Sequence, residues 1–218
     1  MPLAIDSLAI QAPGDAPLFA PVTLSVDAGT VTTVMGPSGV GKTTLLHAIA
    51  GHLPAGFELT GHITLNGRPL NGLPAEQRRI GMMFQEAGLF PHLSVGDNLA
   101  FGLHATVRGR RARSQAVDRA LAAAGLEGMG ERDPATLSGG QRARAALMQS
   151  LLAEPEAILL DEPFSRLDQA LRTGIRTFVL DHIRARSIPA LLVTHDPADA
   201  EAAGGPVIPL GEVAAANT

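Results

Sequence analysis

The feature that most constrains this chain of 218 residues is a glycine-rich segment at residues 36–43. It reads Gly-Pro-Ser-Gly-Val-Gly-Lys-Thr, with an apolar run before it, Thr30–Met35, and a helical pattern after it, Thr43–Ala50. A strand that ends in a G-x-x-x-x-G-K-[ST] loop and opens a helix directs successive backbone N–H groups at one anion. The sequence therefore predicts a nucleotide-phosphate site and a fold in which strands alternate with helices.

The residue types of this segment suit a nucleoside triphosphate with Mg²⁺. Glycines let the backbone curl with positive φ, a lysine ammonium neutralises the β- and γ-phosphates, and a hydroxyl binds Mg²⁺. We expect the last two roles to fall to Lys42 and Thr43. The predicted nucleotide contacts are Gly36, Pro37, Ser38, Gly39, Val40, Gly41, Lys42, Thr43 and Thr44.

Two adjacent acids, Asp161 and Glu162, follow a second apolar run, Ala157–Leu160. A strand buried on both faces does not normally end in two carboxylates without a cationic partner. We predict that Asp161 holds Mg²⁺ and that Glu162 orients the attacking water or accepts a proton from it. A solvated strand end is the alternative, and the phosphate loop in the same chain argues against it.

Residues 138–141 read Ser-Gly-Gly-Gln and precede a strong helical pattern at Arg142–Ala153. A hydroxyl and bare N–H groups at a helix start make a second predicted anion site, formed by Ser138, Gly139 and Gly140. An ordinary serine N-cap is the alternative. The double glycine argues against it, because glycine costs stability in the first turn of a helix.

With these motifs in view, the chain resembles the ATP-binding cassette (ABC) ATPases. Leu137–Gln141 is similar to their signature motif, Gln85 to the Q-loop glutamine, Ser165–Asp168 to the D-loop, and His195 to the switch histidine. The resemblance spans about residues 5–199.

The resemblance implies a head-to-tail dimer that shares each ATP between two copies. ATP held by the phosphate loop of one chain would be covered by Ser138, Gly139 and Gly140 of the other, and Gln141 and Asp168 are further implied nucleotide contacts. The implied catalytic residues are Glu162, His195 and Gln85, and the implied Mg²⁺ ligands are Thr43, Gln85 and Asp161. The remaining histidines show no ligand-like pairing, so no metal beyond Mg²⁺ is expected.

The expected fold class is α/β, with a P-loop NTPase core, a mainly parallel sheet, a small antiparallel β subdomain and an inserted helical subdomain. We expect one domain over 1–218, in which 1–85 and 155–218 form the core and 86–154 the helical part. A further strand is predicted at Ala190–Val193 and an antiparallel one near His62–Leu65. Further helical patterns lie at Ser114–Ala124, Gly140–Ala153 and Ala170–Ala185, and Glu212–Thr218 is expected to fray.

Composition narrows the class of protein. The net charge of −4 disfavours a dedicated nucleic-acid binder, and the absence of cysteine excludes disulfides and thiolate chemistry. No apolar run reaches the about 20 residues that a membrane helix needs, and the first ten residues lack a secretory signal. We therefore expect no nucleic-acid partner and a chain that stays in the cytosol. A peripheral location at the cytoplasmic face of the inner membrane is what the resemblance to transporter ATPases implies.

Within the family, the chain resembles the separate ATPase subunits of bacterial importers. Gly88–Val95 is similar to the stretch that lines a groove for a membrane subunit, and Leu89, Phe90 and Leu93 either suit that groove or belong to the helical core. The segments Asp133–Thr136 and Phe164–Asp168 are most similar to those of short importer ATPases that are sometimes labelled thiamine-like. The implied partners are permease subunits and a solute-binding protein. The rivals are a soluble regulatory ATPase and, far behind, a small-molecule kinase.

The aromatic composition is the main departure from the family, with seven Phe, no Tyr and no Trp. Family members usually stack the adenine on an aromatic residue upstream of the phosphate loop. That place falls near Ala12 and Pro13, and the nearby Phe19 is expected to belong to the core. We therefore predict loose base recognition, since one stacked base contributes about 1–3 kcal/mol.

Overall fold

The structure, a computed structural model, describes residues 2–86 and 88–211, so the predicted fraying of Glu212–Thr218 lies outside it. Its centre is a five-stranded parallel sheet in the order β6-β7-β8-β3-β9. The strands are β3 (Val31–Met35), β6 (Ile80–Met83), β7 (Ala157–Asp161), β8 (Ala190–Thr194) and β9 (Val207–Pro209). Every residue of β7 and β8 is buried, which explains why these strands are continuous apolar runs in the sequence.

A second, antiparallel sheet has the order β2-β1-β4-β5. Its strands are β1 (Leu3–Gln11), β2 (Val22–Val26), β4 (Glu58–Leu65) and β5 (Arg68–Pro69). In β2 the buried residues alternate with exposed ones, as expected for a sheet with one solvated face. The antiparallel strand predicted near residue 62 is the second half of β4.

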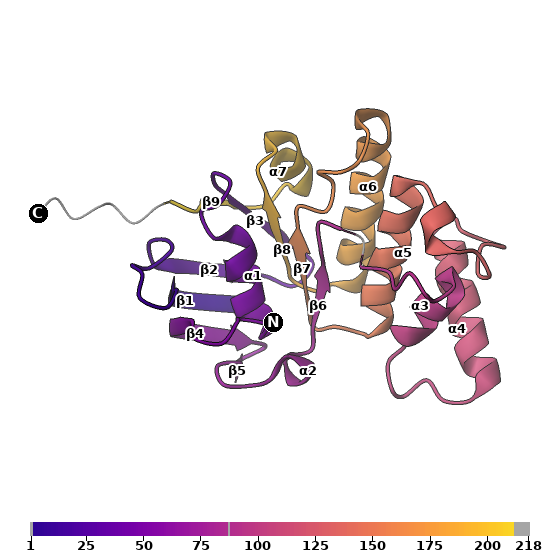
Figure 1. Cartoon of the computed structure of the whole chain (residues 1–218), viewed down its shortest axis with the longest axis horizontal. Coiled ribbons are helices and arrows are strands. Elements are labelled where there is room, and N and C mark those ends of the chain that lie inside the picture. The colour runs from indigo at the N-terminus through magenta and orange to yellow at the C-terminus, as the bar shows by residue number, and fades with distance from the viewer. Residues whose placement is uncertain (1, 87, 212–218) are drawn as a thin grey trace, which may run out of the picture.

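The two faces of the parallel sheet bury different partners. Leu159 and Leu191 pack in one core with α1 (Lys42–Ala50) and the antiparallel sheet. Ile158 and Leu192, one residue along each strand, pack in a second core with the helices. Figure 1 shows the antiparallel sheet and α1 to one side of the parallel sheet and α5 and α6 to the other.

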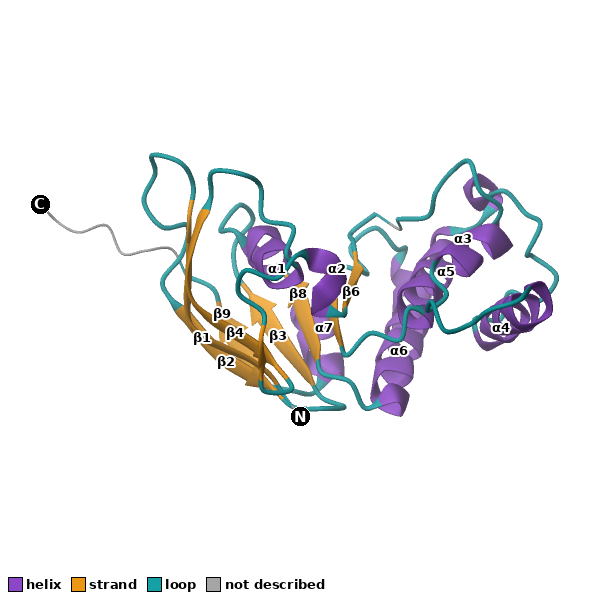
Figure 2. Ribbon diagram, turned by 90° about the horizontal axis from the view of Figure 1, so that it is seen from below, coloured by secondary structure: helices purple, strands orange, loops and turns teal. Residues whose placement is uncertain are grey.

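The helices of the second core come mostly from the segment between β6 and β7. They are α3 (Val95–Phe101), α4 (Arg110–Ala123), a 3₁₀ turn at Pro134–Thr136 and α5 (Gly139–Leu152). The described residues of 86–154 contain no strand, and Figure 2 shows this segment as helices and loops set beside the sheets. The predicted helix from Ser114 begins earlier, at Arg110, because Gly109 takes a φ of 86° that lets the chain enter the helix there.

Three further helices lie within the described residues. A short α2 (Ala75–Arg78) precedes β6, α6 (Gln169–Arg186) follows β7 and packs on α5, and α7 (Pro197–Ala203) follows β8. Within the described residues, no helix combines the length and apolar character needed to cross a membrane.

Candidate nucleotide-binding site

The phosphate loop joins β3 to α1 at the carboxyl edge of the parallel sheet. Gly39 and Gly41 take φ values of 85° and 99°, a region that side chains with a Cβ rarely adopt. A Cβ at Gly36 would lie 2.6 Å from the backbone oxygen of Leu210, so this position also requires glycine. Pro37, Ser38 and Gly39 are exposed, whereas the Val40 side chain is buried in the core beneath the loop. Of these residues, Val40 thus offers only its backbone to a ligand.

The Lys42 side chain folds back onto the start of the loop. Its Nζ donates hydrogen bonds to the carbonyl oxygens of Gly36 and Pro37, both at 2.9 Å, and the residue is only 6% exposed. Nζ also lies 3.9 Å from Glu162 Oε1. A buried ammonium held at the mouth of the loop is a charge available to an incoming phosphate.

Thr43 and Asp161 meet although they are far apart in the sequence. The Thr43 hydroxyl donates to Asp161 Oδ1 at 3.2 Å. Burial raises the pKa of Asp161, the Thr43 hydrogen bond opposes that shift, and the neighbouring Glu162 charge adds to it. A hydroxyl and a partly desolvated carboxylate are oxygen donors of the kind that Mg²⁺ uses together with substrate phosphates. The residues present therefore fit Mg²⁺.

Glu162 and His195 form a contact across two neighbouring strands. His195 Nδ1 lies 3.1 Å from Glu162 Oε2, because β7 and β8 pair in register and both residues follow the strand ends. Glu162 has a φ of 44°, a left-handed conformation that is unusual for glutamate. Strained backbone of this kind is typical of functional sites.

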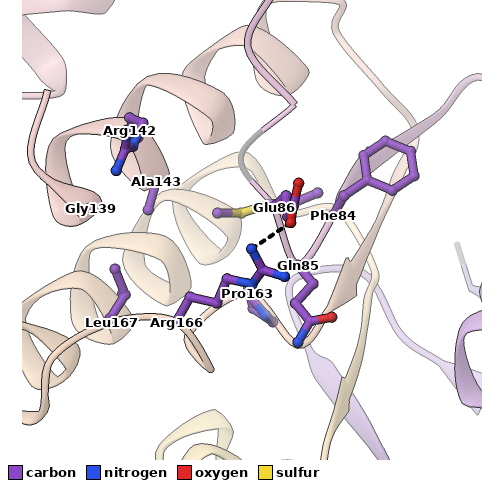
Figure 3. Close-up of a pocket in the computed structure, with 10 residues that line it drawn as sticks. Phe84, Gln85, Glu86, Gly139, Arg142, Ala143, Pro163, Arg166 and Leu167 are labelled. Carbon is purple, nitrogen blue, oxygen red and sulfur yellow. Dashed lines mark ion pairs between the residues drawn. The ribbon is translucent and has the colours of Figure 1, made fainter. Parts of the chain in front are cut away.

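Gln85 contacts the segment after β7 rather than the phosphate loop. Its Nε2 donates to Ser165 Oγ at 3.3 Å, and that hydroxyl donates to the Glu162 carbonyl at 2.9 Å. Next to it, Glu86 and Arg166 form an ion pair. Figure 3 shows this pair across a cavity of about 340 Å³ that α5 borders through Gly139 and Arg142.

The Ser138 region is built as a capping box. Ser138 Oγ accepts from the Gln141 amide at 3.3 Å, and Gln141 Oε1 accepts from the Ser138 amide at 2.9 Å. The serine N-cap weighed against the anion site is thus present, yet the first-turn amides of Gly139 and Gly140 still have no intrahelical acceptor.

Within the described part of one chain, the N-termini of α1 and α5, the two predicted anion sites, make no polar contact with each other. Among the described residues, no hydrogen bond or ion pair joins residues 138–141 to residues 36–44, and α5 packs on α3, α4, α6 and β6 rather than on α1. Asp168, the N-cap residue of α6, is exposed and makes no side-chain cap hydrogen bond. The chain therefore assembles Lys42, Thr43, Asp161, Glu162 and His195, whereas residues 138–141 make no hydrogen bond or ion pair to these residues within the described part of the chain.

Phe19, the aromatic residue nearest to the expected base position, lies in the core as predicted. Phe19 is fully buried and packs against Gly41, where a Cβ would come within 3.1 Å of its ring. Phe19 thus supports the phosphate loop from behind, as expected of a core residue.

Comparison with known proteins identifies the family. The profile described as ABC transporter matches residues 19–165. This chain belongs to the ABC transporter family. The family match spans both the phosphate loop and the Ser-Gly-Gly-Gln helix start, and the chain is an ATP-binding subunit with ATPase activity.

Three relatives illustrate the similarity, and each is named as an ATP-binding protein. An uncharacterized ABC transporter ATP-binding protein, YnjD of Escherichia coli, is 49% identical over 200 residues, which are 92% of this chain and 91% of the relative. The Fe(3+) ions import ATP-binding protein FbpC of Rhizobium etli is 40% identical over 90% of this chain and 56% of its own length. FbpC 1 of Rhizobium meliloti is 40% identical over 86% of this chain. The chain spans just over half of these iron-import relatives, at 56% and 52%.

Proposed function

We propose that this ABC ATPase energises import of a small solute through separate membrane permease subunits. The observation that supports the ATP-hydrolysis step is the site itself: Lys42 and His195 both reach the carboxylate of Glu162, beside the Thr43–Asp161 pair. This arrangement supports hydrolysis of a bound triphosphate rather than storage of it.

In the proposed reaction, water attacks the γ-phosphorus, the bond to ADP breaks, and phosphate and ADP are released. Glu162 orients the water or accepts its proton, His195 holds the γ-phosphate, and Lys42 neutralises charge on the phosphates. Thr43 and Asp161 would hold Mg²⁺, which would neutralise further charge on the phosphates when bound. When nucleotide is bound, Gln85 would contact Mg²⁺ or the attacking water.

The second half of the site is proposed to come from another copy. Within the described residues, Ser138, Gly139, Gly140, Gln141 and Asp168 make no hydrogen bond or ion pair to the phosphate loop of their own chain, which supports the head-to-tail dimer. Residues 86–154 are proposed as a helical subdomain of one domain over 1–218.

The permease contact is proposed on the apolar residues after Gln85. Leu89 and Phe90 are half-buried, and the Phe90 ring lies edge-on to Phe101, 4.7 Å between centroids. Phe101 is 68% exposed and Phe84 is 42% exposed. Exposed aromatic side chains of this size support a protein-binding surface, and a permease would hold the subunit at the inner face of the membrane.

The test is co-purification of the tagged chain from detergent extracts, followed by solute uptake assays. A permease recovered with the chain and lost in a Phe101→Asp variant supports the proposal. Recovery of soluble or nucleic-acid partners alone would favour the rival, a regulatory ATPase. Fe(3+) is the first cargo to assay, because the FbpC relatives are named for it, and thiamine is the second.

A further inference from the structure

Arg172 of α6 holds two segments that approach the site from different strands. Its Nη1 donates to Asp196 Oδ2 at 2.7 Å, and its Nη2 donates to the carbonyl oxygen of Ser165 at 3.2 Å. Asp196 directly follows His195, and Ser165 directly contacts Gln85. One guanidinium therefore ties the segment after β7 to the segment after β8.

The Asp196 side of this link is firmly built. Asp196 Oδ1 accepts from the Ala198 amide at 2.9 Å and so caps α7, while the Asp196 amide donates to Thr194 Oγ1 at 3.0 Å. The Ala198 hydrogen bond, followed by Arg172, lowers the pKa of Asp196. These hydrogen bonds hold the backbone directly after His195, and the carboxylate is the charged partner of Arg172 at neutral pH.

The Ser165 side is held by the same helix. The Ser165 hydroxyl donates to the Glu162 carbonyl, and Arg172 Nη2 also approaches the carbonyl oxygen of Leu167, at 3.5 Å. A movement of residues 165–167 would therefore pull on Arg172 and, through Asp196, on His195.

We propose that Arg172 is a positioning residue that couples residues 165–167 to His195, so that His195 reaches Glu162 only when residues 165–167 are in place. The inference rests on the proposed function, in which a second copy contacts Asp168 at the end of this segment. The single chain already makes the His195–Glu162 contact at 3.1 Å, and docking of that copy on Asp168 would then act on it through residues 165–167.

The chemistry of arginine suits this role. A guanidinium presents donors in a fixed fork and can bind acceptors on two segments at once, whereas a lysine ammonium is a single point. Lys at this position can keep the ion pair with Asp196 but not the carbonyl contacts as well. Since Arg172 and Asp196 are about one-quarter exposed, at 25% and 26%, we expect their pair to affect geometry more than global stability.

Arg184 offers a matched control on the same helix. Its Nη2 donates to the carbonyl oxygens of Ala202 and Ala203, at 3.3 and 3.1 Å. Arg184 thus joins α6 to the end of α7, whereas Arg172 joins α6 to the start of α7 at Asp196. Among the described residues, Arg184 makes no hydrogen bond to residues 194–196.

The experiment compares Arg172→Met, Arg172→Lys and Arg184→Met in the full chain, with Glu162→Gln as reference. For Arg172→Met we expect kcat for ATP to fall about tenfold or more with KM nearly unchanged, since misplacement by about 1 Å can cost about 10²-fold. Amide hydrogen exchange without nucleotide should rise together at residues 165–167 and 194–196. Arg172→Lys should recover part of both effects, and Arg184→Met should show neither.

Two outcomes would overturn the coupling. One is parental kcat and unchanged exchange in Arg172→Met. The other is an equal loss of kcat in Arg184→Met with exchange raised throughout, which would mean general loosening. Parental turnover in Glu162→Gln would instead refute the proposed catalytic site, so the two failures are distinguishable.

Discussion

His195 Nδ1 lies 3.1 Å from Glu162 Oε2, and the other oxygen of the same carboxylate lies 3.9 Å from Lys42 Nζ. One carboxylate thus faces both the phosphate-loop lysine and the histidine after β8. The arrangement forms because β8, which precedes His195, pairs with β7, which precedes Glu162. Helix α1, which begins at Lys42, also packs against β7. Chemistry on a phosphate held by Lys42 would take place within reach of Glu162.

Replacement of Glu162 by Gln keeps the side-chain shape and removes the charge. We expect ATP binding to persist, turnover to fall about 10²–10⁴-fold, and an ATP-bound dimer to accumulate, because a general base is lost. Turnover is measured by phosphate release and the dimer by size-exclusion chromatography with ATP. Glu201→Gln, an exposed glutamate on α7, is the control for the charge change. Parental turnover in Glu162→Gln would remove Glu162 from the mechanism.

Replacement of Lys42 by Ala removes the buried ammonium. We expect ATP affinity to fall at least about 10- to 100-fold, since hydrogen bonds to charged groups contribute about 1.5–3 kcal/mol each. Binding is measured with a fluorescent nucleotide, and circular dichroism verifies the fold. Unchanged affinity in a folded variant would contradict the phosphate-loop assignment.

Base recognition should be loose. The described residues Gln11–Leu18 contain no aromatic side chain, and Phe19 is fully buried, so the site lacks the about 1–3 kcal/mol of a stacked base. We therefore expect ATP and GTP to bind within about tenfold of each other. Ala12→Tyr should tighten ATP binding, whereas Ala16→Tyr in the same loop should not. Strong ATP selectivity in the parent chain would show that another group recognises the base.

Arg78 stabilises the fold at the end of α1. It is 7% exposed and donates to the carbonyl oxygens of Ala48, Ile49 and Leu73 at 2.8–2.9 Å. Arg78→Met should lower the free energy of unfolding by at least about 2 kcal/mol, because each buried carbonyl left without a donor costs about 1–3 kcal/mol. Urea denaturation measures it, with the exposed Arg119→Met as control. Equal stability of the two variants would contradict the capping role.

The contribution of Glu156 to the free energy of unfolding depends on pH. The hydrogen bond from Arg79 lowers its pKa from the ordinary value of 4.5, with Asn66 adding to the shift. A lowered carboxyl pKa contributes stability above the unfolded value, and that contribution is lost as the pH falls through the folded value. Glu156→Gln should therefore be less stable than the parent at pH 7, by up to about 1 kcal/mol.

The difference should shrink as the pH falls well below 4.5, because the parent glutamate then becomes neutral as well. Glu154→Gln, two residues earlier and 68% exposed, is the control and should change little at either pH. A difference that is the same at both pH values would contradict the ionic origin of the effect.

Much of this protein was readable from the sequence because its signals are local. The loop at 36–43 needs glycines at fixed places and a helix directly after it, and both requirements are met within consecutive residues. The strands β7 and β8 are buried on both faces, so they appear as apolar runs that end at their functional residues.

The tertiary structure decided which of these residues meet. Strand order brings Thr43 to Asp161 and His195 to Glu162, and no spacing in the sequence encodes that order. The left-handed φ of Glu162 and the two-segment contact of Arg172 are likewise set by packing, since neither belongs to a sequence pattern. The motifs are visible in the sequence because each is a local requirement of the backbone. Contacts between distant segments depend instead on the register of the sheet and on the helices packed against it.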